Sequence, residues 1–152
     1  MRHFKIVLFC AASLLLAHCG KPYTVGQLFI CNDTNEKLVV ESSIVSALTE
    51  GSKRVLLQTG EILEIARTER QEGYISDFSI MEFVRNEGAC VKVFSLDENG
   101  NEILSAQWSF INKEVDPRSV FNLSNHFYLL YSNPDGGCYP SYTFAILPED
   151  IE

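Results

Sequence analysis

Two segments of alternating apolar and polar residues, joined by an Asn-Gly turn, constrain the fold more than any other feature of this sequence. The segments 90–96 and 102–110 flank Asn99-Gly100, and Asn-Gly is the strongest short signal for a β-hairpin because both residues accept a positive φ. Apolar residues of the second segment alternate with polar ones, so they share one face of the predicted strand. The residues of that face are Leu104, Ala106, Trp108 and Phe110. The only tryptophan of the chain is therefore expected in the core.

The same period-two alternation recurs along most of the chain after residue 24. Turn-forming residues separate the alternating segments, as at 32–35 and at 133–137. A helix at 46–55 is an alternative for that part of the chain, although Gly51 within it disfavours one. Strands are expected at 25–31, 38–45, 55–57, 62–67, 90–96, 102–110, 126–131 and 141–147.

Seven to eight short strands separated by turns predict an all-β fold. We expect an antiparallel β-sandwich, and the central tryptophan together with the length of the domain favours an Ig-like one. A small β-barrel is the alternative architecture.

The first 18 residues have the layout of an export signal. Arg2, His3 and Lys5 form a basic region, and the apolar run 6–17 that follows contains no charge. As a helix this run would rise roughly 18 Å, against about 30 Å of hydrocarbon in a bilayer, so it is too short for a stable span. That length suits the hydrophobic region of a cleavable signal peptide.

Cys19 ends a segment that resembles the bacterial lipobox. Leu16, Ala17 and Cys19 match its pattern of an aliphatic residue, a small residue and a cysteine, while His18 stands where a small residue is usual. The resemblance implies a diacylglyceryl group on Cys19 and an acylated N-terminus, and two or more acyl chains suffice for stable anchoring. By analogy with enteric sorting, Gly20 in place of Asp favours the outer membrane, with the domain facing the periplasm.

The expected organisation is a signal peptide at 1–18, a lipidated tether at 19–24 and one domain at 25–152. Without the signal the chain has 10 basic and 20 acidic residues, a net charge of about −10. That charge argues against nucleic acid as a partner and against electrostatic docking on anionic lipid.

Three cysteines remain once the signal and the lipid attachment site are set aside, an odd number for an oxidising compartment. Cys90 and Cys138 each follow a glycine within two residues, near the start of a predicted strand, so we expect them to form a disulfide. Cys31 lies in an apolar run and is expected to be a buried thiol. The chain has no CxxC motif, so neither a redox site nor a thiolate zinc site is indicated.

The sequence indicates no catalytic site, metal site or cofactor. The mature chain has a single histidine, His126, which excludes a zinc site that needs two. A Ser-His-Asp triad would need His126, and no GxSxG motif accompanies it. Residues 97–102 resemble a calcium loop, but Glu102 stands where that loop requires glycine, so they are read as a hairpin turn.

Five aromatic residues lie between positions 127 and 142, around a Pro/Gly loop. Tyr131 and Tyr139 flank that loop and are the candidates for a binding surface, since tyrosine combines apolar area with a polar tip. The alternative is that these rings pack the faces of the sheet, where tyrosine and phenylalanine are common.

The signal, the small acidic β-domain and the C-terminal segment 142–151 (YTFAILPEDI) together resemble small uncharacterised lipoproteins of Bacteroidetes bacteria. The resemblance implies an Ig-like or related β-sandwich and supplies no functional residues. We expect a non-enzymatic, membrane-tethered binding or accessory module of the cell envelope, with an envelope protein or a glycan as its partner. Two alternatives stay open: an envelope inhibitor of lysozyme or protease, and a hydrolase built around His126.

Overall fold

The computed structural model describes residues 21–44, 53–75, 79–82, 84, 88–112, 116–134 and 136–151. The predicted signal, Cys19 and most of the segment considered as a helix lie outside these residues. The described part of the chain forms ten strands and four short 3-10 helices, so the prediction of an all-β fold is confirmed.

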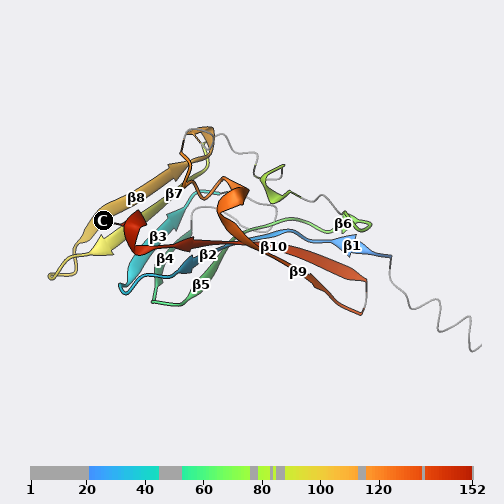
Figure 1. Cartoon of the computed structure of the whole chain (residues 1–152), viewed down its shortest axis with the longest axis horizontal. Helices are drawn as coiled ribbons and strands as arrows, with labels where there is room; N and C mark the ends of the chain where they lie inside the picture. The colour runs from blue at the N-terminus through green and yellow to red at the C-terminus, as the bar shows by residue number, and fades with distance from the viewer. Residues whose placement is uncertain are drawn as a thin grey trace, which may run out of the picture.

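The strands form two sheets that pack as a sandwich (Figure 1). Sheet A has the order β5-β2-β10-β1-β6, with β9 on the opposite side of β10, and sheet B has the order β4-β3-β7-β8. The strands of sheet A are β1 (Tyr23–Thr24), β2 (Gln27–Asn32), β5 (Ile62–Arg67), β6 (Gln71–Glu72), β9 (His126–Ser132) and β10 (Gly137–Ile146). Those of sheet B are β3 (Leu38–Ser42), β4 (Lys53–Leu57), β7 (Cys90–Leu96) and β8 (Glu102–Ser109). The 3-10 helices are η1 (Ile80–Glu82), η2 (Phe110–Asn112), η3 (Leu123–Asn125) and η4 (Pro148–Asp150).

β10 is the central strand of sheet A. On one side it pairs antiparallel with β9, and on the other it pairs parallel with β1 and then β2 in one constant register. Tyr23 lies opposite Gly137 at one end of this pairing, and Asn32 lies opposite Ile146 at the other. This parallel pair departs from the purely antiparallel sheet that we predicted. It joins the two ends of the described chain, so no tight hairpin fixes its direction.

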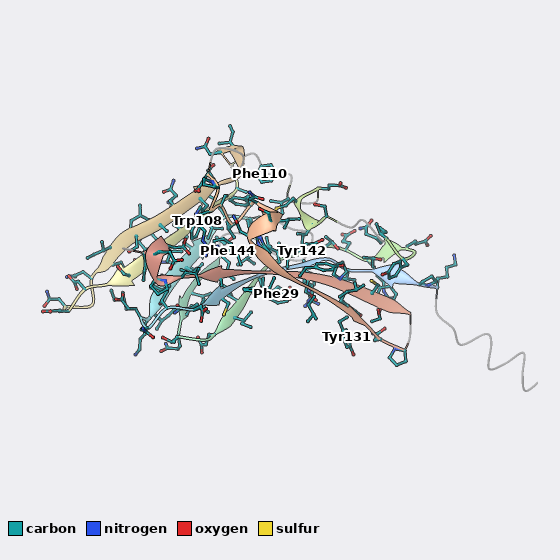
Figure 2. The ribbon with its side chains drawn as sticks, in the orientation of Figure 1. Phe29, Trp108, Phe110, Tyr131, Tyr142 and Phe144 are labelled. Atoms are coloured by element: carbon teal, nitrogen blue, oxygen red, sulfur yellow. The ribbon has the colours of Figure 1, made fainter. Side chains whose placement is uncertain are left out.

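The core lies between the two sheets, and its centre is an aromatic contact across them. Trp108 of β8 is 5% exposed, and its ring meets the edge of the Phe144 ring of β10 at a centroid distance of 5.1 Å (Figure 2). The prediction that Trp108 lies in the core is confirmed. Further fully buried residues of this core are Leu28, Ile30, Leu38, Val40, Ile65, Val91, Val93 and Ile146.

The predicted β7–β8 hairpin is confirmed, but its inner face is shorter than expected. Leu104 is 51% exposed, although its alternation with Trp108 placed it inside. The register of the two strands shifts between Val93 and Phe94, and such an irregularity changes which residues of the strand face the core. The tip of the hairpin also projects past the strands of sheet A (Figure 1).

The domain begins earlier than the predicted boundary at residue 25. Tyr23 and Thr24, assigned to the tether, form β1 and are both buried. The Thr24 hydroxyl donates to the carbonyl of Gly73 at 2.9 Å, and the amide of Gly73 donates to the carbonyl of Pro22 at 2.7 Å. These contacts make residues 22–24 part of sheet A.

Sheet A is longer than sheet B, so one end of it has no sheet opposite. This end, which we call the arm, consists of β1, β6 and the paired ends of β9 and β10 around residues 129–132 and 137–140 (Figure 1). Side chains of the arm cannot be covered by sheet B.

Among the described residues, none of the helices has the length and apolar composition that a membrane span requires.

Candidate functional site

β9 exposes five consecutive large apolar side chains. Successive side chains of a strand point to opposite faces, so this run is uncovered on both faces of the sheet. A strand that is apolar on both faces is usually buried on both. The exposed fractions are 74% for Phe127, 53% for Tyr128, 68% for Leu129, 41% for Leu130 and 58% for Tyr131.

The backbone of β9 has one unpaired edge. The Asn133 amide donates to the Gly137 carbonyl at 2.9 Å, directly beyond the β9–β10 ladder. Because hydrogen-bonded pairs alternate along an antiparallel ladder, Leu129 and Tyr131 also bond to β10, whereas Tyr128 and Leu130 point their N–H and C=O groups outward. Within the described ranges no strand pairs with that outer edge. An open edge without lysine, proline or charge is a template for pairing with another chain.

Tyr131 and Tyr139, the two predicted surface residues, lie opposite each other on β9 and β10. Their ring centroids are 6.0 Å apart. The Tyr139 and Tyr23 rings meet edge to face, with a centroid distance of 6.0 Å, and their hydroxyl oxygens are 2.8 Å apart. The Arg70 guanidinium lies 3.5 Å above the centroid of the Tyr23 ring. Figure 2 shows Tyr131 on the arm, away from the Trp108–Phe144 contact.

These four side chains form one row across the arm, from β9 to the segment before β6. Hydrogen bonds with Tyr139 and with Arg70 lower the pKa of the Tyr23 hydroxyl. Asn133 Nδ2 also reaches the Tyr139 hydroxyl, at 3.4 Å. The row therefore fixes the orientation of Tyr139, which lies beside the exposed ring of Tyr131.

His126 is held as a structural residue at the start of β9. Its Nδ1 donates to the Asn122 carbonyl at 3.1 Å, and its ring packs on Phe144 at 5.5 Å and on Tyr142 at 6.5 Å. Burial lowers the pKa of His126 to about 4, and the positive charge of Arg118 acts in the same direction. Its Nε2 is buried and has no hydrogen-bond partner among the described residues.

A catalytic base needs a hydroxyl or thiol within hydrogen-bond reach, and a carboxylate to orient it. His126 has neither arrangement within the described part of the chain. The structure therefore gives the hydrolase hypothesis no support at the residue on which it depended.

The three described cysteines, Cys31, Cys90 and Cys138, are free thiols, so the expected Cys90–Cys138 disulfide is not formed. Cys90 begins β7 in sheet B, where its amide donates to the Ser43 hydroxyl, whereas Cys138 pairs with Thr24 and Ser132 on the arm of sheet A. The proximity to glycine that suggested the pair does not bring the two strands together. Burial raises the pKa of all three thiols.

The described hollows of the surface contain few ionisable side chains. The larger one, of about 530 Å³, is lined among the described residues by three polar side chains, one proline and one carboxylate. A smaller one of about 250 Å³ lies beside η4 and has one acidic residue, Glu36. No group of three metal-ligating side chains occurs within the described ranges. The residues that line the larger hollow are Gln107, Ser109, Asn112, Asp116 and Pro117.

No family model, curated protein or solved structure in our comparisons matches this chain. Its function must therefore be argued from its own residues. Among these, the exposed strand β9 and the adjoining Tyr139 are the feature least explained by folding alone.

Proposed function

We propose that this chain is a non-enzymatic binding module of the cell envelope, anchored through a lipid on Cys19, and that strand β9 with Tyr139 is its binding surface. The observation that supports this most is the run of five exposed apolar side chains, 127–131, on an unpaired strand edge. The partner in this proposal is an envelope protein or a glycan, met at the outer membrane on its periplasmic side.

The size of the patch supports a binding role. Aromatic side chains offer roughly 150–250 Å² each, so the exposed fractions of the three rings and two leucines leave on the order of 500 Å² of apolar surface along β9. The largest apolar patch of a typical monomer is about 300–600 Å² and is often functional. At about 25 cal/mol per Å², complete burial of this surface would contribute roughly 12 kcal/mol before the entropy of association is subtracted, and a partner that covers part of it gains proportionally less.

The backbone supports a protein partner that binds in an extended conformation. The outward N–H and C=O groups of Tyr128 and Leu130 offer the hydrogen bonds by which an added strand extends a sheet. Apolar side chains on both faces of β9 would then pack against alternate residues of the added strand. A glycan would instead stack on the rings of Tyr131 and Tyr139 and leave the backbone edge free.

The anchor and the binding surface are close together in this proposal. Four residue steps separate Cys19 from Tyr23 in β1, and an extended chain spans at most about 14 Å over that length. A lipid on Cys19 would therefore hold the arm near the membrane surface. A partner in or at the same membrane would be within its reach.

The binding proposal is tested with Leu129→Glu in the full chain and a matched control, Leu104→Glu. Leu104 is 51% exposed on β8, the edge strand of sheet B, so both variants place a carboxylate on an exposed apolar edge position. Chemical cross-linking on membranes, followed by mass spectrometry, should recover a defined partner with the parent chain and with Leu104→Glu, but not with Leu129→Glu. Equal recovery with Leu129→Glu would refute β9 as the binding surface.

Two further measurements separate the parts of the proposal. Mass spectrometry of the mature N-terminus should find a diacylglyceryl cysteine at Cys19, and an unacylated terminus, or one at another residue, would refute the anchor. The inhibitor alternative is the special case in which the partner is a lysozyme or a protease. Adding the purified chain to those enzymes should then lower their activity, and unchanged activity would dismiss this case.

A further inference from the structure

We propose that the occupant of the β9 edge is a second copy of this chain, paired antiparallel with the first about a two-fold axis at Leu129. This inference depends on the proposed function, because it uses the same edge and names its partner. The two copies of sheet A would then form one continuous sheet across the axis.

The free backbone groups limit the possible registers, and the side chains select among them. Tyr128 and Leu130 point their N–H and C=O groups outward, and Leu129 does not. In an antiparallel pair, two outward-pointing residues must face each other to exchange both hydrogen bonds. An axis at Leu129 meets this condition, because Tyr128 of each copy faces Leu130 of the other.

The same register matches the side chains. Leu129 faces Leu129 of the second copy as a non-hydrogen-bonded pair, and Phe127 faces Tyr131 of the second copy on the same side of the sheet. Pairs of aromatic or apolar residues directly across two strands stabilise a sheet by about 0.2–1 kcal/mol each. All five exposed side chains of β9 gain an apolar partner, so the strand is complementary to itself.

Charge and area also favour a second copy. The chain has a net charge of −8, yet 127–132 contain no ionisable group other than tyrosine, so two acidic copies can meet there without like charges opposite each other. Two such patches together expose on the order of 1,000 Å² of apolar surface, and about 1,000 Å² is the smallest total area expected of a specific interface. Both strands are already ordered, whereas a free peptide would lose conformational entropy on binding.

The symmetry is compatible with two anchored chains. A two-fold axis perpendicular to the sheet keeps equivalent atoms of both copies at the same height along that axis. The two β1 strands, and the short segments that precede them, therefore lie at one level. A membrane parallel to the sheet can hold both N-termini.

Cysteine cross-linking of the full chain tests both the partner and the register. In the proposed dimer the two Leu129 Cα atoms are about 4.5 Å apart, which a disulfide can bridge, whereas the two Leu130 Cα atoms are about 8 Å apart, which it cannot. After mild oxidation with oxidised glutathione, Leu129→Cys should run at twice the monomer mass on a non-reducing gel. Leu130→Cys and the parent chain, which controls for the native thiols, should give at least ten-fold less of that band.

Each other outcome overturns the inference in a recognisable way. Cross-linking of Leu130→Cys but not Leu129→Cys would exclude the Leu129 register, and failure of both would exclude the second copy. Sedimentation velocity in detergent provides an independent readout: the parent chain and Leu104→Glu should be dimers, and Leu129→Glu a monomer. If the parent chain is monomeric but still loses an envelope partner with Leu129→Glu, the proposed function stands and only this inference fails. If it is monomeric and binds phosphatidylcholine vesicles through β9, the edge docks on lipid instead.

Discussion

Lowering the pH from 7.5 to 5 should destabilise this protein through His126, and replacing that histidine should remove the effect. The pKa of His126 is about 4 in the folded chain because its ring is buried, against about 6.5 in the unfolded chain. Between these two values the unfolded chain binds more protons. The free energy of unfolding therefore falls as the pH falls below 6.5, and this contribution levels off below about 4. The difference amounts to roughly 2 kcal/mol between pH 7.5 and pH 5.

Urea unfolding at both pH values, followed by the fluorescence of Trp108, measures this loss. The protein concentration must be the same throughout, because association would itself shift the stability. His126→Phe keeps a ring against Phe144 and removes the titrating group, and His126→Gln serves as a second, polar variant. Taking the difference between parent and variant cancels the carboxylates, which they share. If both variants lose as much stability as the parent chain, His126 is not buried as described.

Three further predictions concern stability and thiol chemistry. Asn32→Ala should lower the free energy of unfolding by about 3 kcal/mol. The reason is that the buried Asn32 amide donates to the carbonyls of Glu36 and Leu57 and accepts from Thr34. In the same urea titration the control Asn35→Ala, at an exposed position, should change the free energy of unfolding by less than about 0.5 kcal/mol. Arg118→Met should lower the unfolding free energy by about 3–5 kcal/mol, because it leaves the buried Asp150 carboxylate without its two hydrogen bonds from Arg118. Arg54→Met, which breaks exposed ion pairs with Glu41 and Glu102, should lower it by less than about 1 kcal/mol, and equal losses would contradict the assignment. Iodoacetamide at pH 8 should react at least ten-fold more slowly with Cys31, Cys90 and Cys138 in the native chain than in urea, because burial raises the pKa of these thiols. Peptide mass spectrometry that finds Cys90 linked to Cys138 would refute their description as free thiols.

Local patterns predicted the strands but not how they pair. The Asn99-Gly100 turn identified the β7–β8 hairpin, and alternation placed Trp108 in the core, because both signals depend only on neighbouring residues. The pairing of β2 with β10 joins residues 114 positions apart, such as Gln27 and Ser141. Nothing in either segment specifies its partner. The same lack of long-range information explains the Cys90–Cys138 prediction, which assumed a proximity that the two sheets do not provide.

The candidate site was predicted only in part. The loop between Tyr131 and Tyr139 drew attention to those two rings, and hairpin pairing brings them together. Tyr23 and Arg70 come from distant segments and could not be connected to the loop by spacing. The exposure of Leu129 and Leu130 was also missed, because an uninterrupted apolar run usually indicates a strand buried on both faces. Here β9 ends up at the edge of a sheet that extends beyond its partner sheet, so the run stays uncovered.

Amide hydrogen exchange along β9, followed by NMR at several protein concentrations, shows whether the outer edge of β9 is open in a single chain and pairs with a second one. In dilute solution the amides of Tyr128 and Leu130 should exchange quickly because they point away from β10, while those of Leu129 and Tyr131 should be protected by their bonds to it. Raising the concentration should protect Tyr128 and Leu130 and leave Leu129 and Tyr131 unchanged. Equal protection of all four amides at every concentration would mean that the edge of β9 is already covered, and would contradict the account.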